Sequence, residues 1–217
     1  MKNNVKRISA LFTVIVLCFC VAFEAAAAGY PDYYPNTHRN TGSHIADLLG
    51  VAKTQLGYTE LNSSGNPIPS TSDGGYTKYG ASFGEPNGAW CAYFISWCAS
   101  QAGIPSSIVP RLGNCGTLTD WYQSRSIYYS RSSGYVPKPG DNWSGGSSAQ
   151  HIGIVTGVSG NNLYTIEGNT GGDEGYMCNG RTRGLNASYV LGYGVPKYND
   201  ASTYVGSYAF AASVSSS

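Results

Sequence analysis

The stretch GAWCAYFISWCASQAGI, residues 88–104, predicts a helix that begins near Trp90 or Cys91. Apolar residues are frequent from position 90 to position 102, and Gly103, followed closely by Pro105, is typical of a helix end. Cys91 therefore lies in the first turn, where unpaired backbone N–H groups and the helix dipole stabilise a thiolate and can hold a developing oxyanion. Helix position alone leaves two interpretations open, a reactive thiol and a buried structural cysteine.

The other cysteines constrain the disulfide pattern only in part. Cys98 follows Cys91 by seven residues on the same helix, which separates their Cα atoms by about 10 Å. A disulfide requires Cα atoms within about 7 Å, so we exclude this pair and interpret Cys98 as a core residue. Cys115 and Cys178 can pair with each other, and nothing in the sequence decides whether they do.

Around this helix the pattern predicts helices first and strands afterwards. Ser43 is a candidate N-cap for an amphipathic helix that ends at Gly57, and residues 61–89, rich in Ser, Gly, Pro and Asn, predict a long loop. A short helix is expected at residues 118–124. Strands are predicted at residues 151–158, 163–167 and 189–195. This order is typical of a single α+β domain.

His151 is the histidine best placed for chemistry. His38 and His44 precede or open the first helix, where a solvated or capping role is expected. His151 opens an Ile/Val-rich strand, and alternation places it on one face with Gly153 and Val155. Glycine beside it is expected to leave room for the close approach of a helix end.

The next strand carries a carboxylate that can serve this histidine. Glu167 and Asn169 are two residues apart and so share a face. An odd loop or a β-bulge between the two strands brings them alongside His151, whereas a simple even loop separates them. A carboxylate that orients a histidine supports a cysteine nucleophile. The alternative for Glu167 is a solvent-facing charge.

Both ends of the chain differ in composition from its centre. Residues 1–28 have a basic start, an apolar run at positions 8–23 and four alanines ending at Ala28, the pattern of a secretory signal peptide. The apolar run is shorter than the roughly 20 residues that span a membrane, so we expect secretion and no stable membrane association after cleavage. Residues 29–42 are interpreted as a polar leader and residues 199–217 as a Ser/Ala-rich tail.

The charge content excludes several function classes. The chain has 13 Lys and Arg against 12 Asp and Glu in 217 residues, and loss of residues 1–28 leaves ten against eleven. No stripe of basic residues is present, so we expect no nucleic-acid partner. Phosphate-loop, HExxH and GxSxG motifs are absent from the sequence. We expect a monomer.

Three ordered motifs resemble the CHAP family of cysteine, histidine-dependent amidohydrolases and peptidases. They are the stretch at 88–104, HIGIV at 151–155 and TIEGNT at 165–170. The resemblance covers residues 43–198, through the closing LGYGVPKY, and implies a papain-like α+β domain with the nucleophile helix packed on an antiparallel sheet. It further implies that Cys91 is the nucleophile, His151 the general base, and Glu167 with Asn169 the orienting pair.

Departures from related patterns refine these expectations. NlpC-like peptidases use a second histidine as the third group, and none follows His151 here. Some CHAP enzymes bind calcium through closely spaced aspartates before the cysteine, but Asp73 stands alone there, so we expect no metal and no cofactor. In the family, the Gly-Asp pair matching residues 140–141 leads into an apolar strand. Here NWSGG follows, which weakens the expectation of a strand.

The resemblance implies an enzyme that hydrolyses amide bonds in peptidoglycan peptides, outside the cell or at its wall. Whether it is an amidase or an endopeptidase, and whose wall it attacks, stays open. One alternative is a cysteine peptidase acting on protein substrates. Another is a non-catalytic wall-binding module in which Cys91 forms a disulfide with Cys115 or Cys178.

Overall fold

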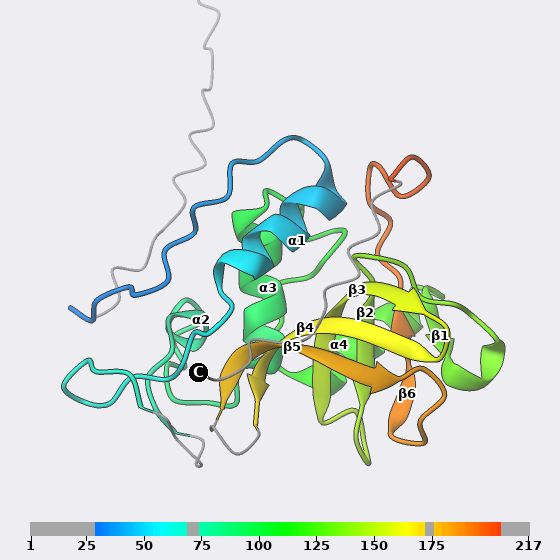
Figure 1. The fold of residues 1–217 in the computed structure, drawn as a ribbon. Coiled ribbons are helices and arrows are strands. Elements are labelled where there is room, and N and C mark those ends of the chain that lie inside the picture. Colours follow the sequence, from blue (N-terminus) through cyan, green and yellow to red (C-terminus); the bar gives the residue numbers. More distant parts are fainter. Residues whose placement is uncertain (1–28, 69–73, 172–175, 205–217) are drawn as a thin grey trace, which may run out of the picture.

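A group of helices precedes a six-stranded sheet along the chain (Figure 1). The computed structural model describes residues 29–68, 74–171 and 176–204, so the predicted signal peptide, Asp73 and the tail beyond residue 204 lie outside the described residues. The elements are α1 (His44–Thr54), α2 (Lys78–Ala81), α3 (Cys91–Gln101), α4 (Cys115–Ser124), β1 (Tyr128–Ser130), η1 (Arg131–Ser133), β2 (Asn142–Gly145), β3 (His151–Ser159), β4 (Asn162–Thr170), β5 (Met177–Gly184) and β6 (Val190–Gly194). The predicted α+β class is confirmed.

The sheet is antiparallel throughout, in the order β1-β6-β2-β3-β4-β5. Three strands, β1, β2 and β5, differ from the expectation, and among the described residues β1 is a short edge strand that pairs only with β6. NWSG at residues 142–145 does form a strand, β2, and the weakened expectation was wrong because all four residues are buried between β3 and β6. β5 was not predicted, since its sequence MCNGRTRG has no apolar alternation.

Each face of the sheet packs against its own apolar cluster. On one face Ile152, Ile154 and Ile166 join the large core formed with α1, α3 and α4. α3 lies directly against β3 and β4 (Figure 1). The other face carries a smaller cluster that includes Trp143 and Val155. Among the described residues no helix is both long and apolar enough to cross a membrane.

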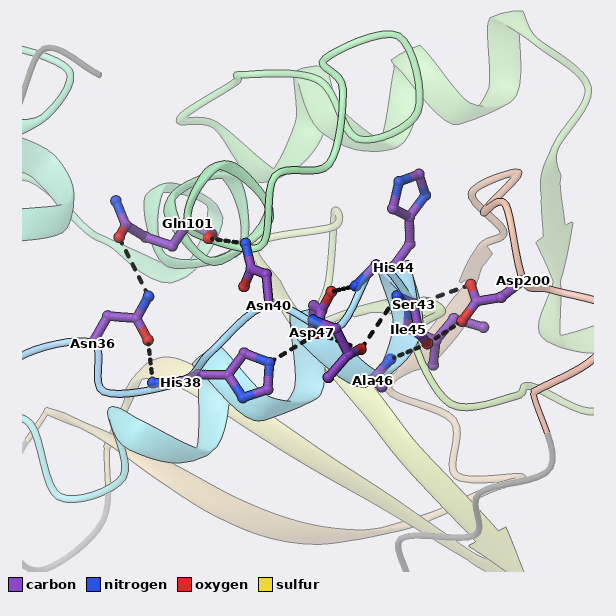
Figure 2. Close-up of polar contacts among 12 residues, drawn as sticks. Asn36, His38, Asn40, Ser43, His44, Ile45, Ala46, Asp47, Gln101 and Asp200 are labelled. Atoms are coloured by element: carbon purple, nitrogen blue, oxygen red, sulfur yellow. Dashed lines mark hydrogen bonds and ion pairs between the residues drawn. The ribbon is translucent and has the colours of Figure 1, made fainter. Parts of the chain in front are cut away.

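Residues 29–42 form neither helix nor strand, yet the part nearest α1 is bonded to the domain (Figure 2). The buried carboxylate of Asp47 accepts hydrogen bonds from the backbone of Thr41 and Gly42 and from His38 Nε2 at 2.9 Å. His38 is therefore a partner of a buried acid and not the solvated residue expected. Ser43 is the N-cap of α1, as predicted, because its Oγ accepts from the Ala46 N–H.

A β-bulge in the β3–β4 hairpin decides which side chains share a face. The two-residue loop between Ser159 and Asn162 is even, but the register changes between Val155 and Gly157 and leaves Thr156 as an extra residue. Ile154 then pairs with Ile166, which places Gly153 opposite Glu167. The bulge thus supplies the odd step that brings Glu167 to the face of His151.

Candidate active site

Cys91 is the first residue of α3, and its neighbours leave the helix start open. The first-turn N–H groups of a helix have no partners within the helix, and the N-cap residue, Trp90, makes no side-chain capping bond to them. The Ala92 N–H points to the Cys91 sulfur. The Cys91 residue is 4% exposed. The Cys91 thiol therefore lies among the backbone N–H donors of the first turn and is largely shielded from water.

The start of α3 is held in place by buried contacts of Trp90. Its indole Nε1 donates to Glu60 Oε1 at 3.0 Å, and its ring stacks on Tyr79 with centroids 5.1 Å apart. On the sheet side the helix approaches β4 at Gly168. A Cβ at Gly168 would lie 2.6 Å from Phe94 Cβ and 2.8 Å from the Trp90 ring. This glycine is what allows the close approach of the helix.

Gly153 makes room for side chains instead of for the helix, contrary to the expectation from the sequence. A Cβ there would lie 2.5 Å from Trp143 Nε1 and 2.6 Å from Glu167 Cγ. The Glu167 side chain therefore passes over Gly153 on its way to His151. The rings of Trp143 and His151 meet edge to face with centroids 5.6 Å apart.

His151 lies between an acid and a thiol. Its Nε2 donates to Glu167 Oε2 at 2.8 Å, which leaves Nδ1 as the nitrogen available to Cys91. Burial opposes a charged imidazole, but the interactions with Cys91 and Glu167 outweigh it and raise the pKa of His151 to about 9. The structure thus brings together three of the four residues predicted for the site, Cys91, His151 and Glu167.

Glu167 is fully buried, so the alternative of a solvent-facing charge is wrong. Its Oε1 accepts from Thr165 Oγ1 at 2.5 Å and from Arg183 Nε at 2.5 Å, and a second Arg183 nitrogen bonds Oε2. Burial raises the pKa of Glu167, but Arg183 and His151 outweigh this and lower it to about 2. The carboxylate is therefore ionised at every pH at which the protein would work.

Arg183 is a site residue that the sequence reasoning missed. It lies on β5, the strand without a sequence signal, and its guanidinium also covers the Trp143 ring at 4.3 Å. A buried Glu167 needs a cationic or hydrogen-bonding partner, and this need is the signal that could have led to a basic residue on a neighbouring strand.

Cys115 is the second residue that was missed. α4 begins at Cys115, three residues before the predicted start, and the sulfur of Cys115 lies 3.1 Å from that of Cys91. The predicted option of a pair with Cys178 is not formed, since the four cysteines at 91, 98, 115 and 178 are all free thiols. A hydrogen bond from Cys115, opposed by burial and assisted by His151, lowers the pKa of Cys91 to about 5.

Asn169 has a less direct relation to the site. Its backbone is left-handed, with φ of 51°, and its side chain is buried. In the described part of the chain Oδ1 has no hydrogen-bond partner, and no hydrogen bond joins Asn169 to His151. The expected orienting pair is therefore represented here by Glu167 with its partner Arg183.

Residues 83–169 match the family model of the CHAP domain. The protein carries a CHAP domain. The match runs from the end of the loop before α3 into β4, includes Cys91, His151, Glu167 and Asn169, and stops before Arg183. Comparison with curated proteins and with solved structures found no match. CHAP domains are typically amidases or peptidases, and many act on peptidoglycan.

Within residues 29–68, 74–171 and 176–204, no three His, Cys, Asp or Glu side chains come together in a way that could hold a metal ion. The chemistry available at the site is that of a thiol, an imidazole and a carboxylate.

Proposed function

We propose that this protein is a secreted cysteine hydrolase that cleaves amide bonds in peptidoglycan peptides, as an amidase or an endopeptidase. The observation that carries the proposal is the alignment of Cys91 at a helix start with His151, whose other nitrogen is bonded to the buried Glu167. A CHAP domain supports the hydrolytic class and the coarse choice of substrate. The wall substrate and the secretion are inferences from the resemblance and from residues 1–28.

The first step is attack by the thiolate. With the pKa of Cys91 near 5 and that of His151 near 9, the pair is a thiolate and an imidazolium at neutral pH. The Cys91 sulfur adds to the carbonyl carbon, and the charge that develops on oxygen is stabilised by first-turn N–H groups of α3. No proton has to leave the cysteine during this step.

Collapse of the tetrahedral intermediate requires an acid. His151 Nδ1 gives its proton to the leaving amine, the C–N bond breaks, and the acyl group stays on Cys91 as a thioester. The neutral imidazole then takes a proton from water, which hydrolyses the thioester and restores the thiolate and imidazolium. Glu167, through its bond to Nε2, keeps Nδ1 directed to the sulfur during both transfers.

Asn169 has a secondary place in this proposal. Its buried Oδ1 is without a partner in the described part of the chain and can accept a hydrogen bond from a group that arrives with the substrate. Its removal should therefore affect binding more than the chemical step.

The experiment that tests the proposal compares the mature protein with Cys91→Ala on purified sacculi, with products identified by mass. Cys98→Ala is a matched control, because it removes an equally buried thiol from the same helix. A free amine on the alanine that was joined to muramic acid indicates an amidase. A new terminus within the stem or cross-bridge indicates an endopeptidase. Equal activity of the wild type and Cys91→Ala would overturn the mechanism.

The two alternatives have distinct outcomes in the same experiment. Cleavage of an unfolded protein substrate without release from sacculi would favour a general cysteine peptidase. Sedimentation with sacculi, without any cleavage and with Cys91 in a disulfide, would favour a wall-binding module. Sequencing the N-terminus of protein recovered from culture medium tests secretion, with a start at Gly29 expected.

A further inference from the structure

A groove of about 450 Å³ lies next to the two active-site thiols. One wall is the turn that leads into α3, with Gly88 and Ala89, and the other is the loop that leads into α4, with Asn114. Ala89 precedes Cys91 by two residues, and Asn114 immediately precedes Cys115. A peptide lying in this groove would therefore pass close to the starts of α3 and α4, where the two thiols lie.

Two aromatic side chains, Tyr93 and Phe83, line the groove. Tyr93 follows Cys91 by two residues on α3, and its ring packs on Phe83 with centroids 4.8 Å apart. The chain opposite leaves space for this ring, because a Cβ at Gly113 would lie 1.8 Å from it. Aromatic faces of this kind contact the methylene groups of an alkyl side chain favourably.

Glu85 supplies the negative charge of the groove. The Tyr93 hydroxyl donates a hydrogen bond to Glu85 Oε2, and burial together with Glu85 raises the pKa of Tyr93 to about 12, so the phenol remains a donor. In the described part of the chain no ion pair is made by Glu85. The nearby guanidinium of Arg111 bonds the Ser82 carbonyl and covers Phe83 at 4.2 Å.

We infer that this groove is a substrate subsite for a primary ammonium group on a peptide, with Glu85 as the counter-charge and Tyr93 and Phe83 as the contact for its alkyl chain. The inference rests on the proposed function and specifies its substrate class: peptides that carry a free amine next to the cleaved bond. That amine can be a peptide α-amine or the side-chain amine of a diamino acid, because both present the same charge on an aliphatic carbon.

Binding is measured first, so that the test does not depend on catalysis. The Cys91→Ala protein is titrated calorimetrically with a stem-type peptide, alanyl-γ-glutamyl-lysine. Three forms are used: both amines free, the α-amine acetylated, and the lysine amine acetylated. We expect acetylation of one of the two amines to weaken binding about tenfold, the usual scale for a charged hydrogen bond. Whichever acetylation has this effect identifies the source of the ammonium.

Glu85→Gln, made in the same Cys91→Ala background, should remove this discrimination and bind the free and acetylated peptides equally. Asp120→Asn is the matched control, since Asp120 is an exposed acid on α4 that does not line the groove. Equal binding of all three peptides by the parent protein, or discrimination that persists in Glu85→Gln, would overturn the subsite.

Substitutions at Gly88 test whether the peptide occupies the groove. A Cβ at Gly88 would be 3.7 Å from the Tyr93 ring, an ordinary contact, so Gly88→Ala fits and Gly88→Leu projects into the groove. We expect Gly88→Leu to weaken binding of the free peptide much more than Gly88→Ala does. If hydrolysis of sacculi fails in the wild type while amine-dependent binding is found, the proposed function fails and the subsite stands.

Discussion

The sulfur atoms of Cys91 and Cys115 lie 3.1 Å apart, each in the first residue of its helix, α3 and α4. The hydrogen bond to Cys91, together with burial, raises the pKa of the Cys115 thiol far above its ordinary value. Cys115 therefore stays protonated and donates to the Cys91 thiolate. Cys115 thus stabilises the nucleophile, the Cys91 thiolate, through a single hydrogen bond.

Cys115→Ala should raise the pKa of Cys91, because the thiolate loses its largest source of stabilisation. The alkylation rate by iodoacetamide, measured against pH, reports this pKa directly. We expect the acid midpoint to move up by about one pH unit, the size expected for loss of one hydrogen bond to a charged group. Cys98→Ala serves as the control, since Cys98 contacts neither sulfur of the pair in the described structure. An unchanged midpoint would show that Cys115 does not act on the thiolate.

The same contact predicts sensitivity to oxidation. A glutathione disulfide can be attacked by the Cys91 thiolate, and the Cys115 sulfur then displaces glutathione to form an internal disulfide. Two protein thiols are oxidised and one glutathione disulfide is reduced to two thiols. Activity should be lost with a mass decrease of about 2 Da and regained with dithiothreitol. Cys115→Ala should instead accumulate a glutathione adduct at Cys91, and a disulfide between Cys91 and another protein cysteine in that variant would contradict the pairing.

The pH dependence of catalysis follows from the two charged partners. Protonation of Cys91 below a pKa of about 5 removes the nucleophile, and deprotonation of His151 above a pKa of about 9 removes the acid that serves the leaving amine. We expect kcat/KM to be flat between these values and to fall on both sides. A profile with a single acid limb would show that His151 does not act as the proton donor.

Arg183 should matter as a positioning residue although it lies outside the stretch matched by the CHAP domain. Arg183→Gln leaves a buried carboxylate with fewer partners, so we expect a loss of stability of about 3 kcal/mol. The pKa of Glu167 should rise, and kcat/KM should fall roughly tenfold or more because His151 is oriented less well. Thermal unfolding and the pH profile of kcat/KM measure the two effects.

Variants at neighbouring positions separate orientation from stability. Arg183→Lys keeps the charge without the two-pronged contact and should recover part of the activity. Arg181→Gln is the matched control, because Arg181 lies on the same strand as Arg183 but its guanidinium bonds Thr170 and Gly171 and not Glu167. A lower melting temperature in Arg183→Gln with an unchanged pH profile would assign Arg183 a structural role only.

The sequence was informative where local patterns act and silent where distant strands meet. The start of α3 at Cys91 and the N-cap at Ser43 follow from local capping and periodicity. The face of Glu167 was left open because it depends on one residue, Thr156, and no local rule places a bulge there. β5 was not foreseen because its stability comes from pairing along β4 and not from its own residues.

Gly153 differs from the prediction because its close contacts are with side chains and not with the helix. The absence of a side chain was correctly associated with a close approach, but the sequence does not say which partner approaches. On β3 the space is filled by Trp143 and Glu167, and the helix approaches at Gly168 of the next strand. Cys115 and Arg183 were missed because the contacts that define them join separate elements.

Gly153→Ala tests whether the route of the Glu167 side chain is needed for function. The added methyl group would lie 2.6 Å from Glu167 Cγ and 2.5 Å from Trp143 Nε1, and both side chains are buried and cannot move away freely. We expect the bond between Glu167 and His151 to lengthen or break and kcat/KM to fall at least tenfold, as for loss of an orienting carboxylate. Ser159→Ala, at the exposed end of the same strand, controls for changes to β3. NMR titration of the His151 ring should give a lower pKa in Gly153→Ala, since the acid raises it in the wild type; an unchanged His151 titration together with wild-type activity would show that Gly153 has no part in placing the acid.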